Sequence, residues 1–350
     1  MELILTLDVG TTSVKACLFD RQLRQTALTS REYALQTRGV CAEVEAQVYL
    51  DAAAQCILSL PAEARARVCA VALTTQGETL LCVDRQGKAL RPAIVWLDSR
   101  AEAQAARLAA VLDRQRFYER TGLPELSGAL PLAKLLWLRE QEPESWARTD
   151  KFLLLEDYLM LWLTGRAVTE KSLLTSTGYF DLQSDDYWDE ALTLAGLDRT
   201  RLPQALACGS IVGPVLPEVA EALGLPASAC VVTGAMDQTA AALAAGCTRP
   251  GTLCETTGTA MVAAAFTAHP QFSEDHHVTI YRHAMPGAYL YLPISNTIGM
   301  SLRWFRDEFC RDLDGGYAAL DRLAEQVPPG AQGVTCLLYT SPSPRDVEES

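Results

Sequence analysis

One segment near the start of the sequence places an acid, a glycine and hydroxyl side chains between two apolar runs. It reads LTLDVGTTSVKACLFD over residues 5–20, and its polar centre contains Asp8, Gly10, Thr11, Thr12 and Ser13. Glycine lets a backbone approach a ligand closely, successive N–H groups of a turn bind anions, and hydroxyls add donors. An ordinary turn is the alternative for one such segment alone. In a phosphate-binding hairpin, Asp8 would hold a hydrated Mg²⁺ rather than the phosphate itself.

A second segment repeats this order of residue types in the other half of the chain. It reads TLCETTGTAMVAAAF over residues 252–266, where an acid again precedes the predicted phosphate-binding residues Thr257, Gly258 and Thr259. Two such hairpins, one in each half, indicate a duplicated fold that presents two turns to one ligand. A phosphate chain held between two domains fits both turns. Neither is a Walker loop, because the sequence contains no G-x-x-x-x-G-K-[ST] motif.

Length and composition restrict the class of protein. A chain of 350 residues with 49% hydrophobic and 21% charged residues is typical of a globular protein with two domains. The net charge of -13 argues against a nucleic-acid binder. No apolar stretch reaches membrane-spanning length, and the start lacks the features of a secretory signal, so we expect a cytoplasmic protein without a membrane partner. The scattered cysteines are expected to be mostly buried free thiols.

Periodicity predicts an α/β protein in which the chemistry-bearing residues follow strands. Short runs rich in Val, Leu and Ile predict strands over residues 3–9, 14–20, 68–75, 79–84 and 93–96. Helical spacing predicts helices over residues 100–115, 132–144 and 155–165. A strand over residues 230–237 passes into a helix over 238–246, and the Pro and Gly of residues 248–251 mark a domain boundary. We therefore expect domains over residues 1–247 and 252–335.

Several blocks in this order resemble the FGGY family of carbohydrate kinases, within the actin-like nucleotide-binding superfamily. Both hairpins are similar to the family's phosphate hairpins. Residues 74–102, TTQGETLLCVDRQGKALRPAIVWLDSRAE, are similar to its sugar-site segment, and KLLWL at 134–138 to its Lys-x-x-Trp signature. GAMDQTAAALAAG at 234–246 looks like the block that holds the catalytic aspartate. The resemblance implies an actin-like (ribonuclease-H-like) duplicated α/β fold, with two domains around a central cleft and the second domain incomplete.

The resemblance also implies roles for individual residues. Asp237 is the implied general base, because phosphoryl transfer to a hydroxyl needs an acceptor for its proton. ATP and Mg²⁺ are the implied cofactors, with Asp8 at the metal and the phosphates on Gly10, Thr11, Thr12, Ser13, Thr257, Gly258 and Thr259. The implied sugar-binding residues are Gln76, Glu78, Trp96 and Asp98.

Each role has a plainer alternative. Asp237 can be the N-cap of a helix that starts near Gln238, and Trp96 can be a core residue. For Arg100 and Glu102 we expect a solvated helix start.

The substrate is less well defined than the reaction. Gly77 stands where glycerol kinases have Arg, the Met-His pair of xylulose kinases is missing, and Ala129 departs from the residue types usual before the Lys-x-x-Trp signature. We expect a small open-chain polyol or ketose, with xylulose-like ketopentoses favoured, and leave a homodimer open. The alternatives are a non-catalytic sugar-sensing protein and an actin-like nucleotide-binding protein. The actin-like protein would have no use for a polyol pocket.

The resemblance ends near Gly333. Residues 336–346, CLLYTSPSPRD, instead resemble the read-through translation of a transposase adapter. We therefore expect residues 336–350 to be a non-native, disordered tail. The chain is then expected to be a fragment that lacks the adenosine pocket of the family's second domain.

Overall fold

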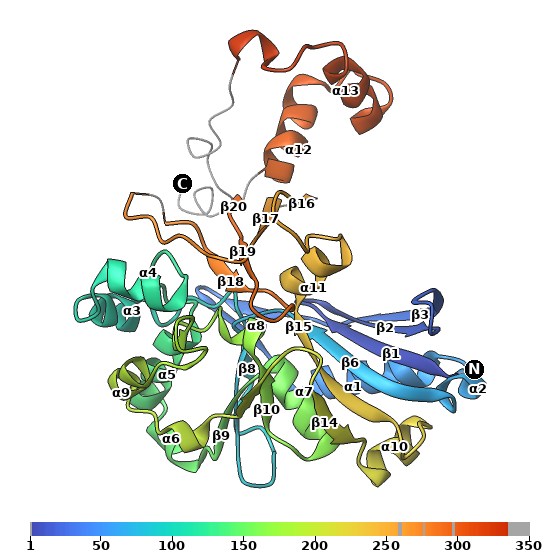
Figure 1. Ribbon diagram of the computed structural model, residues 1–350, viewed down its shortest axis with the longest axis vertical. Coiled ribbons are helices and arrows are strands. Elements are labelled where there is room, and N and C mark those ends of the chain that lie inside the picture. Colours follow the sequence, from blue (N-terminus) through green and yellow to red (C-terminus); the bar gives the residue numbers. More distant parts are fainter. Residues whose placement is uncertain (1, 258–260, 276, 296–297, 335–350) are drawn as a thin grey trace.

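The computed structural model describes residues 2–257, 261–275, 277–295 and 298–334 (Figure 1). The predicted tail at 336–350 therefore lies outside the described residues, as do Gly258 and Thr259. The described chain forms a mixed α/β body with several sheets, from which the last two helices stand apart (Figure 1).

A six-stranded sheet forms the centre of the N-terminal part, in the order β14-β15-β6-β1-β2-β3. Its strands are β1 (Leu3–Val9), β2 (Ser13–Phe19), β3 (Gln25–Glu32), β6 (Val68–Thr75), β14 (Ile211–Pro214) and β15 (Cys230–Met236). Alternate residues of β1 are buried, as expected for a strand with one face on a core. Because β1, β6 and β15 are mutually parallel neighbours, their carboxyl ends lie at the same edge of the sheet.

A second sheet has the order β4-β5-β8-β7-β9. Its strands are β4 (Gln36–Arg38), β5 (Cys41–Val44), β7 (Leu80–Val83), β8 (Ala93–Ile94) and β9 (Lys151–Leu154). Helix α1 (Ala46–Ser59) is not among the predicted elements; it packs against β2 and β3 through Tyr49, Ala53 and Ile57. Helix α7 (Leu155–Thr164) ends at Gly165 in the left-handed conformation, as the sequence predicts.

Two predicted helices are interrupted. In place of one helix over 100–115 there are α3 (Glu102–Ala109) and α4 (Arg114–Thr121), because the Asp113 side chain accepts the Arg116 N–H and starts a new helix. The helix predicted over 132–144 is divided into α5 (Pro131–Gln141) and α6 (Pro143–Arg148), since proline cannot continue the hydrogen-bonding of α5.

Short elements connect these layers. They are α2 (Ala62–Arg65), β10 (Val168–Glu170), α8 (Lys171–Leu174), β11 (Phe180–Asp181), β12 (Asp186–Tyr187), α9 (Asp189–Ala195), a 3₁₀ turn (Arg199–Arg201), β13 (Gln204–Leu206) and α10 (Pro217–Leu223). Parallel pairing of β10 with β13 and antiparallel pairing of β11 with β12 fix the path of the chain beside β15.

A third sheet follows α11 (Asp237–Ala244). It contains β16 (Leu253–Thr257), β17 (Met261–Thr267), β18 (Ile280–Arg282), β19 (Tyr289–Tyr291) and β20 (Ile294–Ser295). Its residues Ala264, Ile280 and Leu290 belong to the same buried cluster as Leu80 and Leu132, so this sheet packs on the N-terminal part. Helices α12 (Ile298–Phe309) and α13 (Gly316–Ala324), and a 3₁₀ turn (Ala331–Gly333), complete the described chain. The domain limits at 247 and 252 stay a prediction.

The cysteines differ in part from expectation. All ten described cysteines are free thiols, but only Cys56, Cys82 and Cys247 are buried and the rest are half-buried. Several lie on strands whose second face is only partly covered, which explains their partial exposure. Among the described residues, no helix combines the length and apolar character that crossing a bilayer requires.

Candidate active site

The register of the central sheet brings three predicted site segments to one edge. Val9 of β1 pairs with Thr75 of β6, and Thr75 pairs with Met236 of β15. The residues that follow these strands therefore begin at the same level, and the Gln76 N–H donates to the Val9 carbonyl at 3.1 Å. This edge combines the first hairpin, the sugar segment and Asp237, as the sequence predicts.

The first hairpin has a turn with free N–H groups. Gly10 N–H donates to the Ser13 carbonyl at 3.0 Å, and the Thr12 carbonyl accepts the Tyr33 N–H at 2.9 Å. The Tyr33 hydroxyl also donates to the Gly10 carbonyl. Within the described chain, the N–H groups of Thr11 and Thr12 have no acceptor. Unpaired N–H groups at an exposed glycine turn fit a phosphate ligand.

Asp8 on β1 is partly exposed at the edge of the first hairpin. Its side chain is 41% exposed and forms an ion pair with Lys15 at 3.3 Å. The described residues contain no group of three or more His, Cys, Asp or Glu side chains that could by themselves hold a metal ion. Mg²⁺ with phosphate ligands needs only one or two carboxylates. A single solvated Asp8 therefore fits Mg²⁺ only together with a phosphate ligand.

The second hairpin is present as predicted in its backbone. Strands β16 and β17 pair in antiparallel register, and Thr257 is paired with Met261 across the turn. The predicted phosphate contacts of Gly258 and Thr259 lie outside the described residues.

Asp237 is the first residue of α11, and Met236 occupies the N-cap position. The expected alternative, an Asp237 N-cap, is therefore not what the backbone shows. Its Oδ1 accepts the Gln238 N–H at 2.6 Å, and its other carboxylate oxygen has no hydrogen-bond partner in the described chain. Burial, reinforced by the negative charge of Asp8, raises the pKa of Asp237 to about 6, against the pull of the Gln238 N–H. Such a carboxylate is a stronger base than an ordinary aspartate and is still ionised at neutral pH.

A buried lysine joins the two halves of the predicted sugar segment. Lys134 of α5 is fully buried, and its Nζ donates to the carbonyls of Val95 at 2.9 Å and Glu78 at 3.2 Å. Burial lowers the pKa of Lys134 to about 7, partly offset by Glu78. Burial and Asp237 raise the pKa of Glu78 to about 7, although Lys134 opposes this. The Lys-x-x-Trp signature thus holds the site together through its lysine.

Gln76 and Trp96 differ in exposure. Gln76 is 3% exposed; its Nε2 donates to the Tyr49 hydroxyl at 3.5 Å, and its Oε1 has no hydrogen-bond partner in the described chain. Trp96 is 38% exposed, so the core-packing alternative for this residue is wrong. Its indole Nε1 donates to Thr11 Oγ1 at 2.9 Å, which links the sugar segment to the first hairpin.

Asp98 and Arg100 form a buried pair beneath Trp96. The Asp98 carboxylate accepts the Ala42 N–H at 2.6 Å and the Arg100 guanidinium at 2.6–2.9 Å. The expectation of a solvated Arg100 is wrong, because its side chain is 8% exposed, bonds Glu43 at 2.7 Å and stacks on Trp137. Glu102 does begin α3 in an exposed position, where its Oε2 accepts the Gly128 N–H at 2.7 Å.

Two residues reach Glu78 from segments with no predicted role. Hydrogen bonds with Ser176 and Tyr281 lower the pKa of Glu78. Ser176 follows α8 and is fully buried, whereas Tyr281 lies on β18 and is 7% exposed. The only sequence signal for either is a hydroxyl side chain near a strand or helix end, which is too common to predict a site.

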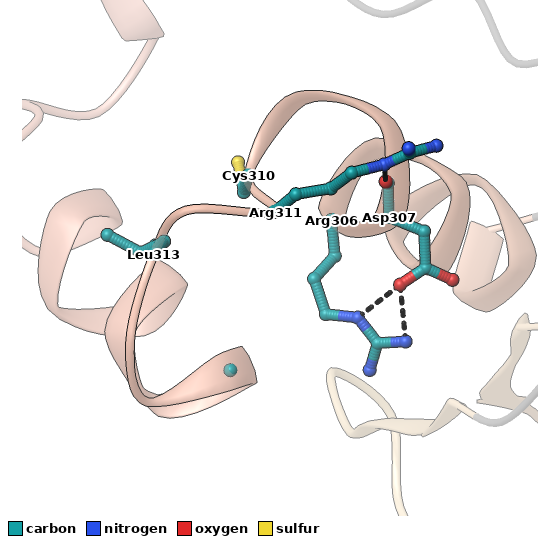
Figure 2. Close-up of a pocket in the computed structure, with 6 residues that line it drawn as sticks. Arg306, Asp307, Cys310, Arg311 and Leu313 are labelled. Carbon is teal, nitrogen blue, oxygen red and sulfur yellow. Dashed lines mark hydrogen bonds and ion pairs between the residues drawn. The ribbon is translucent and has the colours of Figure 1, made fainter.

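A hollow of about 510 Å³ on the α12–α13 pair lies apart from this edge and is not part of the candidate site (Figure 2). Arg306, Asp307, Cys310 and Arg311 line it, and Arg306 forms an ion pair with Asp307 at 2.6 Å. None of its lining residues belongs to β1, β6, β15 or α11, the elements that position Asp8, Gln76 and Asp237.

Comparisons with known proteins agree with this geometry. The family model described as FGGY family of carbohydrate kinases, N-terminal domain, matches residues 3–244. A xylulose kinase of Lactococcus lactis is 30% identical over 345 residues, which are 97% of this chain and 67% of the relative. A gluconokinase of Bacillus subtilis is 27% identical over 349 residues, covering 95% of this chain and 66% of the relative.

A solved structure of a similar protein shares the fold. The crystal structure of xylulose kinase from Rhodospirillum rubrum matches with a TM-score of 0.89 and 30% identity, over 97% of this chain and 70% of that one. The predicted actin-like fold class is thereby confirmed. The chain spans about two thirds of the length of the relatives it matches.

Proposed function

Because the chain belongs to the FGGY family of carbohydrate kinases, we propose that it carries the catalytic edge of an enzyme that phosphorylates a sugar or polyol hydroxyl. The phosphoryl donor is ATP with Mg²⁺, and the cytoplasm is the proposed location. The observation that carries the proposal is the common edge of β1, β6 and β15, where Val9, Thr75 and Met236 are in register and the first hairpin, Gln76 and Asp237 follow directly.

Each residue has a definite task in this proposal. The Asp237 carboxylate accepts the proton of the attacking sugar hydroxyl and orients that oxygen. The free N–H groups of Thr11 and Thr12 bind phosphate oxygens, with the hydroxyls of Thr11, Thr12 and Ser13 as further donors and Gly10 allowing close approach. Asp8 would hold Mg²⁺, which supplies charge neutralisation of the phosphates when bound.

The sugar contacts are proposed on residues that follow β6 and β8. The unpaired Gln76 Oε1 and the Glu78 carboxylate are acceptors for sugar hydroxyls, and the exposed Trp96 ring covers C–H groups. Asp98, whose oxygens are engaged by Arg100 and Ala42, acts by anchoring the loop that presents Trp96. We keep an open-chain ketopentose such as xylulose as the favoured substrate, which the names of two of the reported relatives support.

The test is a substrate panel with the full chain. ADP release is measured with Mg-ATP and xylulose, other ketopentoses, gluconate or glycerol, together with the shift in melting temperature that each ligand causes. A rise in melting temperature with a ketopentose is the expected result, and ketopentose-dependent ADP release is expected wherever the chain also holds ATP. Asp237→Asn should lose at least about 10²-fold in kcat while still binding sugar. Asp51→Asn on the exposed face of α1 is the matched control and should leave kcat unchanged.

The outcomes separate the alternatives. Stabilisation by sugar alone supports the kinase or a sugar-sensing protein, and absence of turnover although Mg-ATP also stabilises the chain would indicate the sensor. Stabilisation by nucleotide alone would indicate an actin-like nucleotide-binding protein. Turnover of Asp237→Asn within a few-fold of the parent chain would remove Asp237 from the base role. A dimer remains a separate prediction, which sedimentation of the same sample decides.

A further inference from the structure

The strand that leads into Asp237 contains a bulge. Val232 pairs with Ala72 of β6 and Ala235 pairs with Thr74, so two residues of β15 stand opposite the single residue Leu73. A side chain at Gly234 would overlap the Leu73 carbonyl oxygen, because the two backbones approach closely there. A bulge removes regular ladder hydrogen bonds, so the amides of this stretch need other acceptors.

A carboxyl group from α7 supplies one of these acceptors. The Glu156 Oε1 accepts the Gly234 N–H at 3.0 Å, and the Glu156 side chain is fully buried. Its Oε2 has no hydrogen-bond partner within the described chain. Burial and the neighbouring Glu170 raise the pKa of Glu156 well above its ordinary value. A neutral acid at this site needs only one acceptor oxygen to hold the Gly234 amide.

A second carboxyl group holds the amide two residues further on. The Glu170 Oε1 accepts the Met236 N–H at 3.2 Å, and the Ser172 hydroxyl oxygen lies 3.1 Å from the same nitrogen. Glu170 also caps α8 through the N–H groups of Ser172 and Leu173. Because Met236 is the N-cap of α11, this bond fixes the point at which the chain turns from β15 into the helix that starts with Asp237.

We propose that Glu156 and Glu170 are positioning residues for the reaction: they hold the Gly234 and Met236 amides and thereby aim the Asp237 carboxylate at the sugar hydroxyl. The inference rests on the proposed function for the role of Asp237. It adds that the direction of Asp237 is determined by two carboxyl groups that never contact sugar or nucleotide. A displacement of about 1 Å at a reacting group can cost about 10²-fold in rate, so such residues matter although they are remote.

The experiment compares two substitutions at one position in the full chain. Glu156→Gln keeps an acceptor oxygen for Gly234 and places its NH₂ group where Oε2 is unpaired. Glu156→Met has a similar volume and removes the acceptor. We expect Glu156→Met to lower kcat for ketopentose phosphorylation by about 10- to 100-fold with KM changed less than about 3-fold, and Glu156→Gln to retain kcat within about 3-fold.

Two further readouts do not depend on turnover. Hydrogen exchange of the peptide spanning residues 230–237 should accelerate in Glu156→Met and not in Glu156→Gln. The ¹³Cγ signal of Asp237 should titrate at a lower pH in Glu156→Met, because a displaced carboxylate becomes hydrated. If the parent chain neither releases ADP nor is stabilised by a ketopentose, the proposed function fails, and these two readouts still decide whether Glu156 positions Asp237.

Asp157→Asn is the matched control. Asp157 is the adjacent buried acid, but its Oδ2 accepts the Leu154 N–H at 2.7 Å and it contacts no amide of β15. When Asp157→Asn and Glu156→Met are compared at the same loss of stability, Asp157→Asn should leave kcat unchanged. It should also leave hydrogen exchange of residues 230–237 and the titration of Asp237 unchanged. Equal effects of Asp157→Asn and Glu156→Met, or an unaltered Asp237 titration in Glu156→Met, would overturn the proposal.

Discussion

The indole N–H of Trp96 is bonded to the hydroxyl of Thr11, with 2.9 Å between Nε1 and Oγ1. The two residues are 85 positions apart in the sequence and belong to segments with different predicted ligands, sugar for Trp96 and phosphate for Thr11. Their contact shows that both segments meet above the carboxyl ends of β1 and β6. The bond therefore ties the segment predicted to bind sugar to the segment predicted to bind phosphate.

This bond should be measurable as a coupling free energy. In a double-mutant cycle of Trp96→Phe and Thr11→Val, we expect a coupling of about 0.5–1 kcal/mol, since a net hydrogen bond contributes about that much. Urea unfolding of the four proteins provides the free energies of unfolding. Effects that add within about 0.3 kcal/mol would show that the bond contributes nothing to stability.

The pH dependence of turnover should report on Asp237. Its raised pKa of about 6 means that the carboxylate, the form able to accept a proton, is lost as the pH falls below that value. We expect kcat/KM to rise with pH below about 6, which is the acidic limb of the profile, and to level off above it. Because the pKa of Glu78 is also raised, Glu78→Gln serves as the control and should keep this limb. A flat profile between pH 4.5 and about 7 would contradict the assignment.

Stability should fall with rising pH because of Asp157. Burial raises the pKa of this carboxyl to about 8, against about 3.9 in an unfolded chain. Between these values the folded chain keeps a proton that the unfolded chain releases, so the stabilisation is full in acid and is lost as the pH approaches 8. The free energy of unfolding should therefore fall less steeply with pH in Asp157→Asn than in the parent chain. The difference in slope is that of one proton, roughly 1.4 kcal/mol per pH unit. Urea unfolding at several pH values between about 5 and 8 measures this; an unchanged slope would count against it.

Gly77 should not accept the arginine that glycerol kinases carry at this position. A Cβ atom at Gly77 would lie 3.0 Å from Ser176 Oγ and 3.4 Å from Met236 Sδ, and Ser176 is fully buried. We expect Gly77→Ala to cost about 1 kcal/mol and Gly77→Arg at least about 3 kcal/mol of stability, without a gain of glycerol phosphorylation. Melting temperatures and the glycerol assay check both statements. If Gly77→Arg is as stable as the parent chain, the Ser176 side chain must move away from residue 77 at little cost in free energy.

Local sequence signals predicted the elements that carry the site. The end of α7 at Gly165 follows from a glycine that alone adopts the left-handed conformation at low cost. Apolar runs interrupted by turn residues predicted the hairpin around residues 10–12, the antiparallel pairing of β16 with β17, and the passage from β15 into α11 at Asp237. Helix α1 also had a signal, since Tyr49, Ala53 and Ile57 recur at helical spacing.

Other features depended on residues brought together from distant segments. Arg100 reads as a solvated helix start, yet Glu43, Asp98 and Trp137 surround it, because their segments converge on one side of the second sheet. The bonds of Glu156 to Gly234 and of Glu170 to Met236 span 78 and 66 residues.

The sequence by itself therefore determined the strands, turns and helices that carry the site and the identity of the acids at their ends, because backbone conformation and alternation are set by near neighbours. Only the tertiary structure decided which of these acids are solvated, which are buried with raised pKa values and which hold a neighbour's amide. Desolvation and hydrogen bonding depend on what packs against a group in space, and in this protein those partners come from distant parts of the chain.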